Sequence, residues 1–211
     1  DKADARLIAR FIAERYRELP PYDPTPDVLY QVSLLIRFSR GLSSQRGAVL
    51  NRLHAWRYAW PEGLALVADV PLVIGSLHDQ VREKALALLR SDPLLWQWYV
   101  ALQALPGVGP TLALDILAYS GDFRRFKSAR AYAAYTGLTP RLYQSGLISE
   151  RGAMSRMGPS ALRAAYWLAA LHAQKVEPYA ALVARLLDRG KPKKLALVAV
   201  ANRLARAAWV V

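Results

Sequence analysis

The chain reads Leu102-Gln103-Ala104-Leu105-Pro106-Gly107-Val108-Gly109-Pro110-Thr111-Leu112-Ala113 near its middle, and this stretch indicates the fold class most clearly. Two apolar segments, the second reaching about Tyr119, flank a Gly-x-Gly turn. Such a helix-hairpin-helix exposes backbone N–H groups to a phosphate, which makes Gly107 and Gly109 candidate nucleic-acid contacts. The same pattern also fits a plain helix connection, with Gly107 ending one helix and Pro110 opening the next.

Upstream, the apolar spacing predicts long helices. Residues 3–19 form an amphipathic helix that Pro20-Pro21 ends. From Val28 to Trp56 an apolar residue recurs every seven positions, which predicts either a coiled-coil seam or packing against another helix of this chain. Residues 76–90 form a second amphipathic helix. Residues 27–90 are therefore expected to make a long helical hairpin suited to dimerisation.

Downstream, Ser91-Asp92-Pro93 is a helix-start pattern, and the domain boundary is placed there. Helices are expected over residues 128–135 and 160–175 and from the basic loop at 189–194 to the end. Residues 136–151 are expected to be a turn-rich loop, with any strand short and near residues 142–148. The predicted fold class is therefore all-α, a long helical hairpin followed by a compact helical domain over residues 91–211.

The net charge of +13 is concentrated in the C-terminal part of the chain. Residues 1–122 hold 13 acidic and 13 basic side chains, whereas residues 123–211 hold 16 basic and 3 acidic ones. Such a one-sided field attracts a polyanion, and tyrosines interleaved with the cations favour nucleic acid over a merely solubilising surface or an anionic membrane.

Other classes of protein are disfavoured. There is no cysteine, and the three histidines lie far apart, so neither a disulfide framework nor a zinc site is expected. The longest apolar stretches are interrupted by charges or proline, and the first residues do not resemble a signal peptide. A protein of the cytoplasm without a membrane span is the expectation.

One hydroxyl lies between arginines, at Gln144-Ser145-Gly146. A serine oxygen is a credible nucleophile toward a phosphodiester where cations offset the charge that develops on the phosphate. Ser145 is accordingly a candidate catalytic residue, although Ser-Gly is also an ordinary turn dipeptide.

Nearly the whole chain resembles transposases of the insertion sequence 110 (116/902) type, which are regarded as RNA-guided DNA recombinases. The ordered matches are these: Leu105 to Pro110, Gly121-Asp122, Arg125 to Arg130, Ala134 to Arg141, Gln144-Ser145-Gly146, Gly158, Leu162-Arg163 and Gly190 to Val200, with a weaker patch at Asn51 to His54.

The resemblance implies that Ser145 attacks DNA and forms a phosphoserine intermediate, and that a bridging guide RNA selects the target. It also implies that residues 1–19 end a ribonuclease-H-like domain, in which Asp1 and Asp4 belong to an Asp-Glu-Asp-Asp site for Mg²⁺. From the residues alone, the preferred interpretation of those two carboxylates is that they are helix N-terminal acids, which the helix dipole favours. Candidate contacts to phosphates, DNA backbone or guide RNA are Arg125, Lys127, Arg141, Arg151, Arg156, Arg163, Lys191, Lys193 and Lys194.

Two departures from the family accompany the resemblance. The first Asp and the Glu of the metal site, with their sheet, are not in these residues, so the chain resembles a fragment or decayed copy. Gly158-Pro159 also stands where the family usually has Gly-Asn. The alternative functions are a non-catalytic helix-hairpin-helix DNA-binding module, a metal-dependent nuclease in which Ser145 is incidental, and a helical interaction scaffold.

Overall fold

The computed structural model describes residues 2–18, 27–145 and 148–210, and between 141 and 153 it describes the backbone only. The helices are α1 (Lys2–Arg15), α2 (Asp27–Ala59), α3 (Pro61–Leu64), α4 (Val70–Arg90), α5 (Pro93–Gln103), α6 (Pro110–Ser120), α7 (Ala129–Tyr135), α8 (Ser160–Ala173), α9 (Tyr179–Asp188) and α10 (Lys193–Val210), with a 3₁₀ turn, η1 (Phe123–Arg125). Two strands, β1 (Pro140–Ser145) and β2 (Ile148–Met154), complete the described elements.

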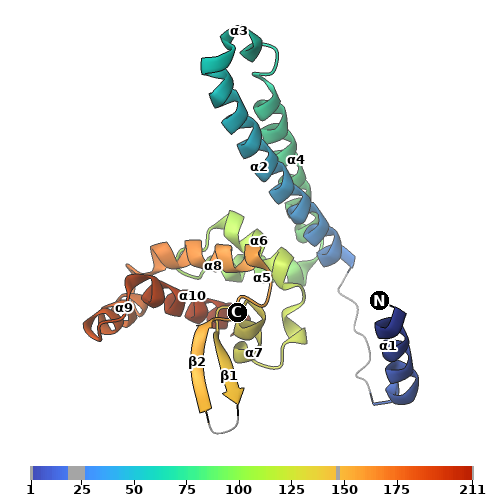
Figure 1. Ribbon diagram of the computed structural model, residues 1–211, viewed down its shortest axis with the longest axis vertical. Coiled ribbons are helices and arrows are strands. Elements are labelled where there is room, and N and C mark those ends of the chain that lie inside the picture. Colours follow the sequence, from blue (N-terminus) through green and yellow to red (C-terminus); the bar gives the residue numbers. More distant parts are fainter. Residues whose placement is uncertain (1, 19–26, 146–147, 211) are drawn as a thin grey trace.

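Helices dominate the molecule, so the predicted all-α class is confirmed, with one small antiparallel β-hairpin as its exception. Helices α2 and α4 lie side by side as an arm, with α3 at its tip (Figure 1). The remaining helices from α5 onward form a body at the foot of the arm, and the β-hairpin projects from this body on the side away from the arm (Figure 1).

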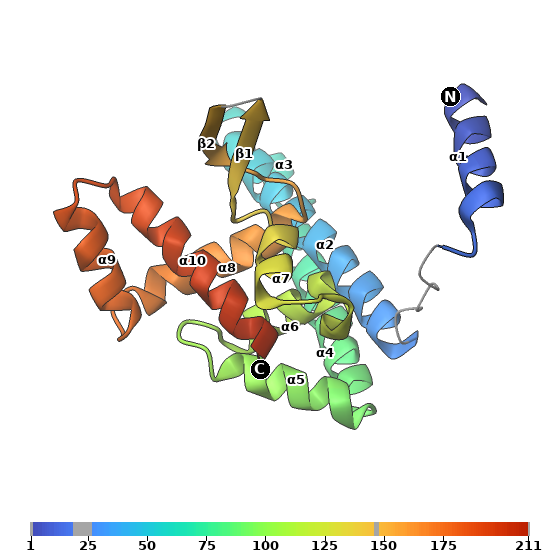
Figure 2. The same cartoon turned by 90° about the horizontal axis from the view of Figure 1, so that it is seen from below.

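Helix α6 is the centre of the body. It contacts α2, α5 and α8, and its side chains from Ala113 to Ala118 are buried. A helix whose side chains are apolar on most sides is expected to be enclosed in this way, and its one carboxylate, Asp115, is paired with Arg82. Helix α10 packs across α7, α8 and α9 (Figure 2), and its Val200 and Leu204 are fully buried.

Local signals explain where the body helices begin. The Asp92 carboxylate accepts hydrogen bonds from the backbone N–H groups of Leu94 and Leu95 at 3.0 and 3.1 Å, with Pro93 at the first helical position. Such a cap satisfies N–H groups that have no partner inside the helix. The predicted helix start at Ser91-Asp92-Pro93 is confirmed.

The arm differs in detail from the heptad prediction. Helix α2 buries Leu29, Val32, Ile36, Ser39 and Leu42. Val28 and Leu35, which the heptad placed on the seam, are only half-buried, and Trp56 is exposed. The spacing of three and four residues is right, but the buried face is rotated from the predicted one because α2 packs on both α4 and α6.

Three other predictions need correction. Helix α4 begins at Val70 rather than at residue 76, because Pro71 occupies the first turn, where its missing N–H costs nothing. The turn-rich loop over 136–151 is largely the β-hairpin, which extends beyond the predicted strand region to Met154. Helix α9 was not predicted, although its sequence is amphipathic and rich in helix formers.

Candidate nucleic-acid interface

Ser145 lies at the tip of the β-hairpin. The strands pair antiparallel, and the last pair is Ser145 with Ile148. The two connecting residues lie outside the described part of the chain, and nothing is described of the side chains of Ser145, Arg141 and Arg151. The backbone therefore establishes where the candidate nucleophile is in the fold, at the end of an element that projects from the body.

Two hollows meet at the foot of this hairpin, and both are lined by Thr139 and Pro140. The first, between α7 and α10, has a volume of about 550 Å³. The second has a volume of about 420 Å³. The first is completed by Arg130, Ala133, Ala134, Asn202 and Arg206, and the second by Leu138, Met154, Arg156, Pro192, Lys194, Leu195 and Val198.

Four cations surround these hollows. Arg130 and Arg206 line the first, and Arg156 and Lys194 line the second; all four are exposed. Among the described side chains, no carboxylate lies within ion-pair distance of any of them. Exposed cations without an ion-pair partner among the described side chains, gathered at the base of a projecting hairpin, make a surface suited to a phosphate backbone. We call these four residues the hairpin-base cations.

The backbone around Arg156 is held in an unusual shape. Arg156 has φ of 56°, and its N–H donates to the carbonyl oxygen of Gly137 at 3.2 Å. Gly137 itself has φ of 70°, and Gly158 has φ of 142°. A Cβ on Gly158 would lie 2.0 Å from the carbonyl oxygen of Tyr135, so only glycine fits there. The glycine of the predicted Gly158-Pro159 pair thus has a steric role.

Two of the predicted phosphate contacts, Arg163 and Arg125, donate hydrogen bonds to backbone carbonyl oxygens of the protein itself. Arg163 Nη1 donates to the Gly158 carbonyl oxygen at 2.7 Å and braces the segment that carries Arg156. Arg125 Nη2 donates to the Ser120 carbonyl oxygen at 2.8 Å, and its guanidinium lies 4.6 Å from the ring centres of both Phe126 and Tyr135. Arg163 and Arg125 therefore have structural roles that the sequence pattern did not indicate.

The remaining predicted cations are spread over the surface. Lys127, Lys191 and Lys193 are exposed, and of the predicted lysines only Lys194, in the first turn of α10, lines a hollow at the hairpin base. The structure therefore brings Arg156 and Lys194 together with two residues that the sequence analysis missed, Arg130 and Arg206. Those two lie far apart in sequence, and only the packing of α7 against α10 brings them together.

At the turn between α5 and α6, Gly107 has a packing role. Its φ is 80°, and a Cβ there would lie 2.3 Å from the carbonyl oxygen of Ala169 in α8. Gly109 is exposed at the start of α6 and has open space around it. The hollow at this turn is lined by Gln103 to Gly109 and His172, without a lysine or arginine. The steric requirement at Gly107 matches the plain helix connection.

The predicted metal ligands are only partly described. Asp4 is exposed in the first turn of α1, and Asp1 lies outside the described residues. Among the residues whose side chains are described, 2–18, 27–140 and 154–210, no group of three or more His, Asp or Glu side chains lies close enough to hold a metal. Within the same ranges, no helix is long and apolar enough to cross a membrane.

A buried chain of hydroxyl groups links helices α6, α7 and α8. Ser120 Oγ lies 2.6 Å from the Tyr132 hydroxyl, which lies 2.7 Å from the Tyr166 hydroxyl. Burial raises the pKa of Tyr132 and of Tyr166 well above the ordinary tyrosine value. Both phenols therefore stay neutral at physiological pH. Their hydrogen bonds in the core tie α6, α7 and α8 together.

The chain is similar to transposases and to a pilin gene-inverting protein. Residues 99–184, from α5 to α9, match the family model described as "Transposase IS116/IS110/IS902 family". The chain is 27% identical over 225 residues to the "Pilin gene-inverting protein" of Moraxella lacunata, with 100% of this chain and 65% of that protein covered. The "Putative transposase y4pF/y4sB" of Sinorhizobium fredii is 36% identical over 147 residues, covering 64% of this chain and 38% of that protein.

A third relative carries a similar name. The "Transposase for insertion sequence element IS1328" of Yersinia enterocolitica is 32% identical over 114 residues, which is 52% of this chain and 34% of that protein. The chain thus spans 65% of the length of the pilin gene-inverting protein and about a third of the two transposases.

Proposed function

We propose that this chain, which carries a transposase domain of the IS116/IS110/IS902 type, is the C-terminal portion of an enzyme that binds DNA and breaks and rejoins it through Ser145. The observation that carries the proposal is the placement of Ser145 at the tip of a hairpin whose base is flanked by the hairpin-base cations. Duplex backbone lying across those cations would come within range of the projecting hairpin.

The proposed reaction is a transesterification. The Ser145 hydroxyl loses its proton as its oxygen attacks the phosphorus, a serine–phosphate ester forms, and one P–O bond to a deoxyribose breaks. The sugar oxygen leaves as a hydroxyl after taking up a proton. Attack by a hydroxyl of another strand reverses these changes and releases the serine. The free energy of the broken phosphodiester is conserved in the serine ester, so rejoining needs no separate energy source such as a nucleoside triphosphate.

The cations have a defined part in this proposal. They offset the charge of the phosphates near the reacting one, and exposed arginine is well suited to a phosphate because its planar guanidinium donates two parallel hydrogen bonds. Arg130, Arg156 and Arg206 are of this kind. Arg141 and Arg151 flank the serine in the hairpin sequence and are proposed to act at the scissile phosphate itself.

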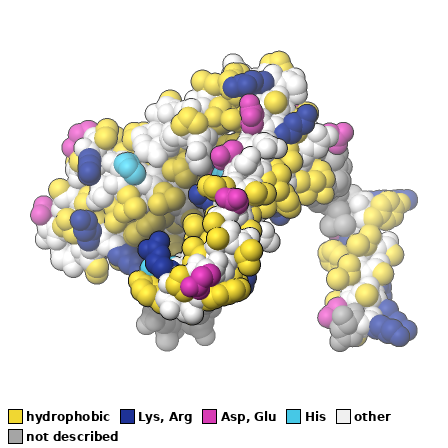
Figure 3. Space-filling view, turned by 90° about the horizontal axis from the view of Figure 1, so that it is seen from above, with side chains coloured by type: hydrophobic (Ala, Val, Ile, Leu, Met, Phe, Trp, Pro, Cys, Tyr) yellow, Lys and Arg dark blue, Asp and Glu magenta, His cyan; other side chains and the backbone are white. Residues whose placement is uncertain are grey.

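Three further parts of the proposal concern the intact enzyme. A guide RNA is proposed to lie along the exposed lysines Lys191 and Lys193. Helix α1, whose Leu7 and Phe11 are 65% and 50% exposed, is proposed to pack in the ribonuclease-H-like domain (Figure 3 shows hydrophobic side chains along it at the right). Asp1 and Asp4 are proposed to join a Mg²⁺ site completed by other residues, and no step is assigned to that metal.

Oligomer formation through the arm is also proposed. Tyr30, Leu34 and Phe38 recur every four residues on α2 and are 58%, 50% and 55% exposed. Residues at this spacing lie on one face of a helix. A second copy of the chain pairing along the arm would bury that face. Analytical ultracentrifugation tests the proposal, because L34E/F38E is then expected to be monomeric at concentrations where the wild-type chain is not.

Strand exchange tests the central proposal. In the full-length protein, Ser145→Ala is expected to abolish joining of a donor and a target duplex while DNA binding persists. Ser149→Ala, in the opposite strand of the same hairpin, is the matched control and is expected to retain joining. Joining by Ser145→Ala at the wild-type rate would contradict the assignment and favour either a water-activating nuclease site or a binding module.

A further inference from the structure

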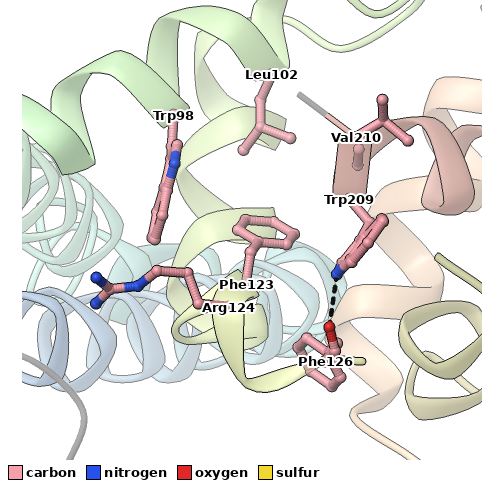
Figure 4. Close-up of a pocket in the computed structure, with 8 residues that line it drawn as sticks. Trp98, Leu102, Phe123, Arg124, Phe126, Trp209 and Val210 are labelled. Carbon is pink, nitrogen blue, oxygen red and sulfur yellow. Dashed lines mark hydrogen bonds between the residues drawn. The ribbon is translucent and has the colours of Figure 1, made fainter. Parts of the chain in front are cut away.

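An aromatic hollow lies apart from the hairpin, where α5, η1 and the end of α10 meet (Figure 4). Its floor is buried: Leu102 is 1% exposed and Phe123 7%. Trp98 and Trp209 stand on opposite sides of Phe123 and are half-buried (Figure 4). The full lining is Trp98, Leu102, Phe123, Arg124, Phe126, Ala208, Trp209 and Val210.

The walls are held in place by other groups. Trp209 Nε1 donates to the carbonyl oxygen of Phe126 at 3.1 Å. The ring of Trp98 meets Phe123 edge-on, with 5.8 Å between centres. Because the indole N–H of Trp209 is already used, this wall offers a ligand an aromatic surface rather than a hydrogen bond. The hollow therefore suits a flat ring that is recognised by stacking, with little dependence on its substituents.

The size of the hollow and the charge around it limit which ligands it can hold. The volume is about 250 Å³, below the range of roughly 300–1,000 Å³ for pockets that hold drug-sized ligands, so one ring system fits. The segment 121–130, which contributes Phe123, Arg124 and Phe126 to the lining, holds four basic side chains and one acidic one in its sequence. Arg124 is aligned by Asp122, 2.6 Å away, and its guanidinium lies 5.9 Å from the ring centre of Trp98. A ring attached to a phosphate backbone matches this combination.

We propose that the hollow receives one extrahelical nucleobase of bound DNA, which stacks against the aromatic walls that Trp98 and Trp209 form while its backbone lies along the neighbouring basic segment at Arg124 and Lys127. The inference rests on the proposed DNA-binding function. An enzyme that exchanges strands must unpair bases near the break, and holding one of them outside the duplex would stabilise the opened state. Unstacking a base costs free energy, and the aromatic walls offset that cost.

Bulged DNA provides the test. Binding of the chain to a duplex with one unpaired thymine is compared, by fluorescence anisotropy, with binding to the same duplex in which that nucleotide is abasic. The duplex with the thymine bulge is expected to bind about tenfold more tightly, a ratio that corresponds to the free energy typical of one base–aromatic stack. Trp98→Leu and Trp209→Leu are expected to bring the ratio close to one. Trp167→Leu, half-buried on α8, is the matched control and should keep the wild-type ratio.

A second measurement needs no variant. With 2-aminopurine at the bulge, the wild-type chain is expected to quench the fluorescence of the base, because the base stacks on indole. Tight binding of both duplexes with equal affinity, and without quenching, would overturn the proposal and leave DNA binding intact. That outcome is also the one expected if the hollow holds an aromatic side chain of another protein. Failure to bind either duplex would instead contradict the proposed function.

Discussion

Glycines shape the segment that presents Arg156. Gly137 and Gly158 both have positive φ, and the carbonyl of Gly158 holds Arg163 at 2.7 Å. A side chain at Gly158 would meet the Tyr135 carbonyl, so the cation Arg156 is positioned by backbone that no other residue type adopts without strain. The chemistry of the hairpin base thus depends on residues that carry no functional group.

The steric requirement for glycine at position 158 can be measured as a change in the free energy of unfolding. Gly158→Ala is expected to destabilise the chain by about 2–4 kcal/mol, because backbone strain and steric overlap with the Tyr135 carbonyl add together. Gly190→Ala is the matched control: its φ is 71° but nothing lies within 4 Å of the added Cβ, so a loss of only about 1 kcal/mol is expected. Urea unfolding monitored by circular dichroism compares the two. Equal losses would show that the contact at Tyr135 is unimportant.

Asp122 makes stability depend on pH. Burial acts to raise the pKa of Asp122, but hydrogen bonds and the charge of Arg124 outweigh it and hold the pKa below the ordinary value. Because the folded pKa is the lower one, the stabilisation is complete above the ordinary Asp pKa and is lost as pH falls through the folded value. Asp122→Asn is therefore expected to be less stable at neutral pH and to lose less stability on acidification. Thermal melts between neutral pH and pH about 3 measure this, and parallel wild-type and variant curves would contradict it.

At the scale of elements, one ion-pair cluster joins the arm to the body. Arg82 of α4 donates to Asp115 of α6 at 2.9 Å and to the Thr111 carbonyl oxygen at 3.0 Å. Arg40 of α2 lies 3.9 Å from the other carboxylate oxygen of Asp115. The side chains of Arg82 and Asp115 are only 13% and 11% exposed. The cluster therefore fixes both arm helices against the central helix.

Removing one member leaves a nearly buried charge without its main partner. Arg82→Met is expected to cost about 2–3 kcal/mol, and the double variant R82M/D115L is expected to recover part of the loss, because the carboxylate is then gone as well. Arg10→Ala removes an exposed ion pair of 3.8 Å and is expected to cost less than about 0.5 kcal/mol. Chemical unfolding gives all three values, and an additive double variant would contradict the coupling.

The elements differ in how well their sequences predict them. Helices α2, α5 and α6 follow from their apolar spacing, with the Asp92 cap at the start of α5 and a largely apolar sequence in α6. The hairpin from Pro140 to Met154 lacks a clean alternation of polar and apolar residues, so its sequence resembles a loop. Helix α9 carried an adequate signal, since its apolar residues recur at helical spacing. The start of α4 differs from the predicted residue 76 because the apolar spacing used for the prediction begins at Leu77, whereas the helix starts earlier, with Pro71 in its first turn.

At the scale of the whole molecule, the charge division locates the interface only coarsely. It indicates residues 123–211 as the candidate binding surface, and the fold gathers four of their 16 cations, the hairpin-base cations, around the two hollows. Arg125 and Arg163 could not be separated from them by sequence, because their partners are backbone carbonyls supplied by the fold. Arg130 and Arg206 become neighbours only when α10 packs against α7.

Salt dependence tests this selection. R130Q/R206Q is expected to weaken binding to duplex DNA and to lower the slope of log K against log salt by about 1–2, since each lost phosphate contact removes about 0.9. R52Q/R57Q on the arm changes the net charge equally and is the matched control, with a slope close to that of the wild type. Titrations by fluorescence anisotropy at several salt concentrations measure both. Equal slopes for the two variants would show a diffuse field rather than a defined interface.

We propose that Ser145 becomes covalently joined to DNA during the reaction. The most direct measurement is mass spectrometry of peptides from the full-length protein, after it has been trapped on a DNA substrate nicked beside the exchange site and digested. We expect a nucleotide attached through phosphate to Ser145, and its absence in Ser145→Ala. An adduct on another residue, or cleaved DNA with no adduct under the same conditions, would contradict the account.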